Sequence, residues 1–349
     1  MTRIELLHRG PLKEKNLNLG FEHLYQQGSL LNIDYIPFTL PENHTMSEAL
    51  DPYIIQKLPT EFILKTAKHG GSLEVHGIYP KHFEFQYAQD LQNGNLLELN
   101  FYHRPTTRIY NVVRPRFFIG KNFERFIVCV PPGPDYIKHY GTMVRHLVIR
   151  NDLKNNVKLL YYPIAYHTLP FWTGLHNGFI YKKDRVILGY VNEVYNEISS
   201  SIDLIPVSTS SSPYIESRRY RLPSGSIINF LGVNFSFWGD LSKIISESIC
   251  QSGANEIIYA GKLGSMTTPD SLYKDLFSPT EYYTLSHKNI VNHVQNLKNG
   301  LVNMYPELNS GCHVSVPTVL EEDYIQRSIS EEINANSIDN EISQMIVSI

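Results

Sequence analysis

A glycine-flanked turn with a lysine inside it is the stretch of this sequence best suited to binding a ligand. Gly261-Lys262-Leu263-Gly264 directly follows Glu256 to Ala260, a short apolar run typical of a buried strand. Ligands of α/β sheets bind at the carboxyl ends of strands, where such turns lie. The Lys262 ammonium could serve as a point charge for a phosphate or a carboxylate, or it could fill the subsite and exclude phosphate. A lysine that points into solvent accounts for the residue equally well.

A second glycine turn is a candidate anion site. The apolar run Phe126 to Val130 is typical of a strand buried on both faces, and it ends in the turn Pro131 to Asp135. Backbone amides beside Gly133 could hold an anion, as amide nests do elsewhere. A plain Pro-Gly turn is the alternative interpretation.

The aromatic segment Ala165 to Gly174 combines turn formers with large rings, and we expect it to form a loop. Either Phe171 or Trp172 could stack on a base, and His167 could donate a proton. The alternative is a hydrophobic plug that holds two parts of the chain together.

The elements around these candidates indicate an α/β architecture. A helix is predicted from Asp240, with apolar residues at helical spacing, and Gly253 is placed to end it. From Ser72 to Val113 the apolar period changes to two, which predicts four strands, 72–79, 82–89, 95–103 and 107–113. Asn93-Gly94 predicts a hairpin between the second and third strands. We therefore expect an α+β extension at 1–115, of unknown role, and an α/β domain at 116–349.

Composition limits the possible partners. The chain has 349 residues, is 42% hydrophobic and carries a formal charge of -3, so no overall field favours nucleic acid or an anionic membrane. The first 20 residues lack an apolar signal core, and no stretch reaches the length of a membrane span. The three cysteines lie far apart without metal-ligand spacing, so we expect reduced, buried thiols, no metal and a cytoplasmic location.

The order of motifs in the second half resembles the purine and uridine phosphorylase superfamily, which includes the methylthioadenosine and adenosylhomocysteine nucleosidases. Four segments match in order: the strand and glycine turn Phe230 to Gly239, the turn Gly261 to Gly264, the strand end near Val319, and Ile338-Asp339-Asn340-Glu341. The run Ile127 to Tyr136 matches the first family strand and its phosphate-contacting glycine turn more weakly. The resemblance covers roughly residues 116 to 349 and implies a three-layer domain with a mixed central sheet.

The resemblance also assigns roles to residues. It implies that Glu341 accepts hydrogen bonds from the two ribose hydroxyls and that Val319 stands where the family stacks on the base. Asn340 replaces a methionine in the apolar floor under the sugar, and Lys262 replaces a small hydroxyl residue. Tyr259 stands where many phosphorylases carry a phosphate-binding arginine, and nucleosidases, which use water, also lack that arginine.

Cleavage of an N-glycosidic bond needs an anionic group near the ribose, a nucleophile and a group that stabilises the leaving base. In the family, a strand beyond the glutamate helix carries the aspartate that protonates the leaving purine, and the printed sequence ends at Ile349. Either the general acid is absent, or another segment supplies it, or the sequence is a shortened version of a longer ancestor. The candidates for another source of the acid are Asp339, His167, Asp240 and Asp135. A missing general acid lowers the rate by roughly 10²- to 10⁴-fold.

Two functions follow from the sequence. The first is an enzyme that cleaves the N-glycosidic bond of a nucleoside- or nucleotide-like substrate without a metal or organic cofactor, with phosphate a possible co-substrate. The alternative is an inactive family member that binds a nucleoside-like ligand or another protein. Glu341 and the glycine turns favour the first, whereas Tyr259, Lys262 and Val319 favour the second. The resemblance also implies a homo-oligomer.

Overall fold

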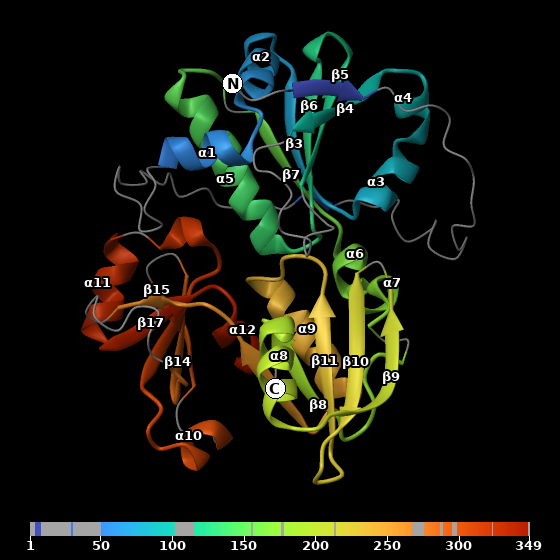
Figure 1. Cartoon of the computed structure of the whole chain (residues 1–349). Helices are drawn as coiled ribbons and strands as arrows, with labels where there is room; N and C mark the ends of the chain where they lie inside the picture. The colour runs from blue at the N-terminus through green and yellow to red at the C-terminus, as the bar shows by residue number, and fades with distance from the viewer. Residues whose placement is uncertain are drawn as a thin grey trace. The chain divides into compact units, whose positions relative to one another are not determined.

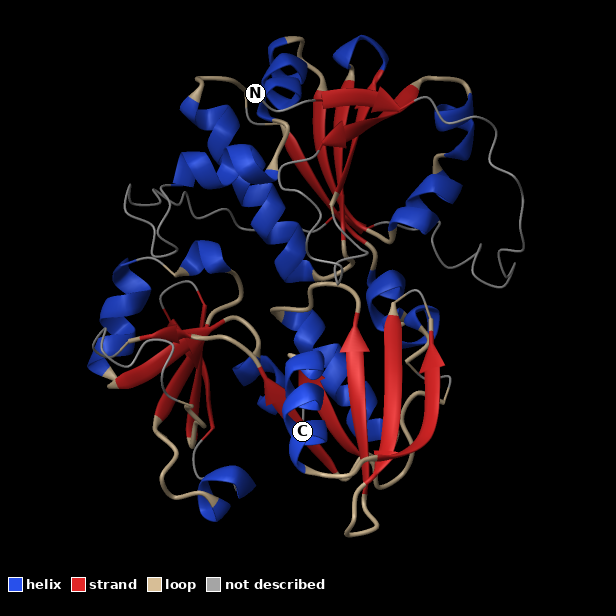
Figure 2. Cartoon of the chain, viewed as in Figure 1, coloured by secondary structure: helices blue, strands red, loops and turns tan. Residues whose placement is uncertain are grey.

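The computed structural model describes residues 4–7, 29–30, 50–101, 115–154, 156–175, 178–212, 214–266, 276–286, 289–294, 299–322 and 324–347. The chain forms two compact units, Met1–Thr168 and Leu169–Ile349, called unit 1 and unit 2 below. Each combines mixed sheets with helices, so the α/β class expected from the sequence is confirmed (Figure 2).

Unit 1 is built on one seven-stranded sheet with the order β1-β4-β5-β6-β3-β7-β2. Its central strands β6, β3 and β7 are parallel, and the others pair antiparallel. The strands are β1 (Ile4–Leu7), β2 (Ser29–Leu30), β3 (Ser72–Gly77), β4 (Leu96–Phe101), β5 (Arg116–Gly120), β6 (Arg125–Val130) and β7 (Val157–Tyr161). β6 is buried over almost its whole length, as its unbroken apolar run predicts.

Helices cover both faces of this sheet (Figure 1). Figure 1 shows α1 (Leu50–Lys57), α2 (Thr60–Lys68) and α5 (Pro134–Arg150) on one face, and α3 (Pro80–Gln86) and α4 (Ala88–Gln92) on the other. The short helices η2 (Lys121–Phe123) and α6 (Pro163–His167) complete the unit. α5 begins with Pro134 after Gly133, since proline fits the first helical position without losing a hydrogen bond.

The prediction of a strand at 82–89 and a hairpin at Asn93-Gly94 is wrong. This segment forms α3 and α4 because Pro80 begins a helix and Phe83 and Tyr87 lie one helical turn apart, with their rings stacked at 4.5 Å. The alternation of apolar residues at 82–87 fits a strand and a short helix equally well. The strand expected at 107–113 lies outside the described residues.

The structure divides the chain at a different point from residue 115. β5 and β6 pair with β4 and β3 in one sheet, so residues 116–130 belong to unit 1. The sequence suggested a boundary there because the apolar pattern changes, but that change marks the passage from outer antiparallel to central parallel strands. The assignment of 116–349 to one nucleoside-binding domain stays a prediction.

A buried histidine in β3 contacts two polar side chains within unit 1. His76, with no exposed surface, lies 3.0 Å from Glu74 Oε2 through Nε2 and 3.0 Å from the Tyr162 hydroxyl through Nδ1. Burial lowers the pKa of His76, and Glu74 only partly offsets this. Burial would raise the pKa of Glu74, but hydrogen bonds from His76 and Ser72 outweigh it and lower that pKa.

Unit 1 should therefore lose stability as the pH falls from 7.5 to 4. Both pKa values are lower in the folded state, so the unfolded chain takes up protons first, and acid favours unfolding. Hydrogen exchange of the β3 amides, measured by mass spectrometry at several pH values, reports this. The variant His76→Asn should show a flatter pH dependence, and an equally steep one would contradict the prediction.

Unit 2 contains two five-stranded sheets. Sheet B has the order β12-β8-β11-β10-β9, and sheet C has the order β13-β17-β16-β14-β15. Sheet B consists of β8 (Arg185–Gly189), β9 (Ile205–Ser211), β10 (Ile215–Arg221), β11 (Ile227–Val233) and β12 (Glu256–Ala260). Sheet C consists of β13 (Gly264–Ser265), β14 (Glu281–Ser286), β15 (Asn289–Val294), β16 (Cys312–Ser315) and β17 (Ala335–Asp339).

The helices of unit 2 link its sheets. α9 (Asp240–Gln251) packs against α12 (Ile342–Val347), and α12 packs against β14 and β16. The others are α7 (Leu169–Thr173), α8 (Val191–Ser201), α10 (Gly300–Met304), η4 (Val319–Glu321) and α11 (Tyr324–Glu332). In the described part of the chain, no helix is both long and apolar enough to span a membrane.

Two local expectations in and around unit 2 are wrong, and a third is met in part. The expected loop at 165–174 forms the short helices α6 and α7. The segment 338–341, matched to the start of the family's glutamate helix, instead ends β17, because pairing with β16 takes up its backbone through Asp339. The cysteines are free: Cys129 and Cys312 are buried, as expected, whereas Cys250 is half-buried.

Candidate functional site

The end of β17 brings three predicted residues beside the glycine turn. Gly264 in β13 pairs with Ile338, so the turn at Lys262 and Leu263 runs next to Asp339, Asn340 and Glu341. The Gly239 amide donates to the Asn340 carbonyl at 2.7 Å, and the Ser242 hydroxyl donates to the Glu341 carbonyl at 3.0 Å. Residues predicted from separate motifs therefore meet where sheet C and α9 join.

Aromatic rings from sheet B lie near the same place. Tyr259 in β12 packs edge-on against Phe237 with 6.3 Å between ring centroids. The Lys262 ammonium lies 5.8 Å from the ring centroid of Tyr190, within the range of a cation–π contact. Burial raises the pKa of Tyr259, and the carboxyl groups of Glu341 and Asp339 raise it further. Tyr259 is thus a neutral hydroxyl close to both carboxyl groups.

Gly189 allows β8 and β12 to approach each other at this point. It has φ +94, and a Cβ built there would meet the Ala260 carbonyl oxygen at 2.1 Å. The next residue, Tyr190, donates its backbone amide to that same oxygen at 2.8 Å. Any side chain at position 189 must therefore move the strand end that carries Tyr259.

Gly189→Ala should destabilise unit 2 by about 1–3 kcal/mol, from backbone strain and the contact with Ala260. Urea unfolding followed by tryptophan fluorescence measures this, since the two tryptophans, Trp172 and Trp238, both lie in unit 2. The matched control is Gly225→Ala, because Gly225 also has positive φ (+83) but nothing within 4 Å of the added Cβ. Equal losses in the two variants would contradict the close approach.

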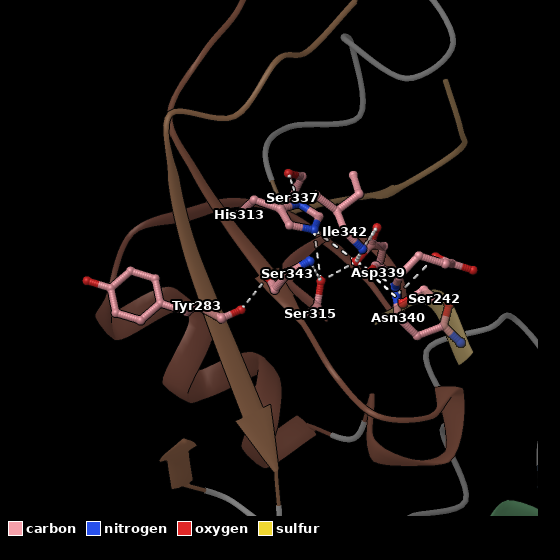
Figure 3. A network of polar contacts seen from close by, with 10 residues as sticks. Ser242, Tyr283, His313, Ser315, Ser337, Asp339, Asn340, Ile342 and Ser343 are labelled. Carbon is pink, nitrogen blue, oxygen red and sulfur yellow. Dashed lines mark hydrogen bonds and ion pairs between the residues drawn. The ribbon is translucent and has the colours of Figure 1, made fainter. Parts of the chain in front are cut away.

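Asp339 is an ionised carboxylate held by the chain around it (Figure 3). It accepts backbone amides of Glu341 at 3.1 Å and Ile342 at 3.1 Å, and the Ser315 hydroxyl at 2.5 Å. His313 Nε2 lies 2.9 Å from the same carboxylate. Burial would raise the pKa of Asp339, but His313, Ser315 and the Glu341 amide outweigh it and lower that pKa.

The surroundings of Glu341 shift its pKa in the opposite direction to that of Asp339. Burial raises its pKa well above the ordinary value, and the charge of Asp339 and the Glu322 carboxyl raise it further. The Asn340 backbone amide, 3.3 Å from Glu341 Oε2, only partly offsets this. With its amide oriented to donate, the Asn340 side chain lies 2.8 and 2.9 Å from the two Glu341 oxygens. The surroundings thus shift the pKa values of two neighbouring carboxyl groups in opposite directions, which is the usual arrangement of an acid beside a base.

The remaining predicted residues lie elsewhere. Gly133 and His167 belong to unit 1, where Gly133 precedes α5 and His167 is exposed at the end of α6. The backbone of Trp172 lies in α7. Val319 is half-buried in η4, on the segment that also carries Glu322. Within unit 2 the structure therefore joins Tyr259, Lys262, Asp339, Asn340 and Glu341.

Sequence reasoning missed the polar residues behind Asp339. His313 and Ser315 alternate along β16, and parallel pairing sets them opposite Ser337 and Asp339 of β17. His313, Ser315 and Ser337 are almost fully buried. The available signal was a period-two run of polar residues inside an otherwise apolar strand, which predicts a buried hydrogen-bond network.

No family model matches the chain. A curated protein, "Oxidoreductase cns1" of Cordyceps militaris, is 26% identical over 362 residues, covering 97% of this chain and 44% of that protein. The chain thus spans less than half the length of this curated relative.

Similar solved structures include enzymes that act on nucleosides. A futalosine hydrolase mutant of Helicobacter pylori has a TM-score of 0.36 at 14% identity, covering 48% of this chain and 82% of that one. A 5'-methylthioadenosine/S-adenosylhomocysteine nucleosidase of Campylobacter jejuni has a TM-score of 0.35 at 14% identity, covering 48% and 79%.

Proposed function

We propose that unit 2 binds a nucleoside-like ligand beside Glu341 and cleaves its N-glycosidic bond. The observation that carries the proposal is the contrast between two adjacent carboxyl groups. His313, Ser315 and two backbone amides surround Asp339 and lower its pKa, whereas burial and the Asp339 charge raise the pKa of Glu341 well above its ordinary value. A carboxylic acid that stays neutral at physiological pH can protonate a leaving base. Glu341 thereby takes the role of the acid for which the sequence offered no compelling candidate.

In the proposed reaction, the bond between the anomeric carbon and the base nitrogen breaks as Glu341 gives its proton to the base. The sugar becomes oxocarbenium-like, and water or phosphate then attacks the anomeric carbon. Attacking water loses a proton as its bond to the anomeric carbon forms, and the Glu341 carboxylate takes up a proton to restore the acid. The Asp339 charge, close to Glu341, opposes ionisation of Glu341 before the substrate binds. The rings of Tyr259 and Phe237 offer a surface for the base, and Lys262 offers a charge for an anionic group.

The experiment is release of free base from a panel of purine and pyrimidine nucleosides and nucleotides, with and without phosphate. Release without phosphate indicates a nucleosidase, and release that requires phosphate indicates a phosphorylase. If no base is released but a nucleoside raises the Tm of the protein, the chain binds the ligand without catalysis. Neither release nor a Tm shift with any member of the panel would refute the proposed site.

A redox role is the second candidate. It is favoured by the relative named as an oxidoreductase, whose alignment covers 97% of this chain. The alignment covers 44% of that relative, so the matched region would be one part of a longer enzyme. Thermal shifts with NAD⁺, NADP⁺ and FAD, measured beside the nucleoside panel, separate the two candidates.

A further inference from the structure

The hydrogen bonds around His313 determine where its hydrogens lie. Ser315 Oγ donates its single hydrogen to Asp339 and accepts the Ser343 amide at 2.9 Å, so towards His313 Nε2, 3.3 Å away, it can only accept. An ionised carboxylate also only accepts. His313 Nε2 therefore carries a hydrogen and donates it to Asp339 at 2.9 Å. On the other side of the ring, Nδ1 lies 2.8 Å from the Ser337 hydroxyl.

The His313–Asp339 pair lies where its protonation state affects the pKa of Glu341. His313 is fully buried and 3% of the Asp339 side chain is exposed, so water cannot replace a lost donor easily. Asp339 is close to Glu341 in sequence and accepts the backbone amide of Glu341. The charge of Asp339 raises the pKa of Glu341, so the two carboxyl groups titrate as a coupled pair.

We infer that His313 decides which of the two carboxyl groups holds the shared proton: its Nε2–H bond keeps Asp339 ionised, so the proton stays on Glu341. His313 is thus a positioning residue that acts through Asp339. We also expect His313 to set the upper pH limit of activity, and this second statement rests on the proposed function.

Other titratable groups face the pair from neighbouring elements. Glu322, which follows η4, adds a carboxyl group near Glu341. Tyr259 in β12 faces both carboxyl groups, and Tyr190 lies beyond it. Burial and Asp339 raise the pKa of Tyr282 in β14 to about 12. Tyr259 and Tyr282 are therefore neutral near pH 7, and His313 is the titratable group that donates a hydrogen bond to Asp339.

The test is carboxyl ¹³C NMR of the full chain without ligand, with the Glu341 signal assigned from Glu341→Gln. His313→Leu removes the donor, so Asp339 should take the proton and the titration of Glu341 should move down by more than one pH unit, towards the ordinary value of about 4.3. His313→Gln supplies an N–H at a similar place and should retain the wild-type titration. An unchanged Glu341 titration in His313→Leu, or an equal shift in both variants, would overturn the inference.

Ser315→Ala provides an independent variant if His313→Leu does not fold. It removes another donor to Asp339 but leaves the His313 Nε2–H bond in place, so the Glu341 titration should stay within one pH unit of wild type, and a larger downward shift would overturn the inference. Because no substrate is used, the titration does not depend on the proposed function. If base is released, the basic limb of its pH profile should move down with the Glu341 titration. If the titration moves as expected and no base is released, the inference stands and the proposed function fails.

Discussion

Glu341→Gln should lower the rate of base release by about 10²- to 10⁴-fold, the usual contribution of one general acid. Glutamine has the shape of the protonated glutamate and can still donate a hydrogen bond, but it cannot transfer a proton. Ligand affinity, measured by thermal shift or calorimetry, should therefore change little, because burial and the Asp339 charge raise the pKa of Glu341 and favour its neutral form before the substrate binds. The loss should appear in kcat rather than in KM.

The control for this variant is Glu332→Gln, the same substitution at an exposed carboxyl group in the last turn of α11. It should leave the rate of base release unchanged. Wild-type activity in Glu341→Gln would show that another group protonates the base. Loss of binding with Glu341→Gln would instead favour the role that the family resemblance implies, an ionised carboxylate that binds the ribose hydroxyls.

Patterns contained within one element were predicted well from the sequence. The strand Glu256–Ala260 and the helix from Asp240 both form where the periodicity places them, and Gly253 ends the helix region with φ +83. The strand prediction at 82–89 failed because the segment forms α3 and α4, which bury Phe83 and leave Phe85 47% exposed, whereas a strand would have put both on the same face. Local periodicity cannot separate these cases when the run is shorter than about ten residues.

The site residues likewise fall into those that local sequence patterns predict and those that depend on the pairing of distant strands. Motif order led to Tyr259, Lys262 and Glu341, because each follows or precedes an element that the sequence pattern predicts. The pairing of His313 with Asp339 could not be found that way, since its partners Ser337 and Asp339 lie 24 and 26 residues further along the chain. Parallel pairing of β16 with β17 brings them together, and that register is a property of the folded sheet.

Asp184→Ala should destabilise unit 2 by about 3–5 kcal/mol, the largest stability effect we expect from one substitution. Asp184 is almost fully buried just before β8 and accepts two hydrogen bonds from the Arg219 guanidinium, at 2.8 and 2.9 Å. It also accepts the Asn229 amide at 3.2 Å. Removing the carboxylate leaves a largely buried guanidinium without a counter-charge, at the base of the strand that ends beside Tyr190.

Two comparisons separate this effect from the loss of any surface ion pair. Glu256→Ala breaks the neighbouring pair with Arg185, which is 3.5 Å apart and about half exposed, and should cost less than about 1 kcal/mol. Asp184→Ala combined with Arg219→Met should be less destabilised than Asp184→Ala alone, because no uncompensated charge remains buried. Urea unfolding followed by tryptophan fluorescence gives all three values. If Asp184→Ala costs no more than Glu256→Ala, the buried pair does not hold sheet B together, and the support for the Tyr259 side of the site must come from α9 and sheet C.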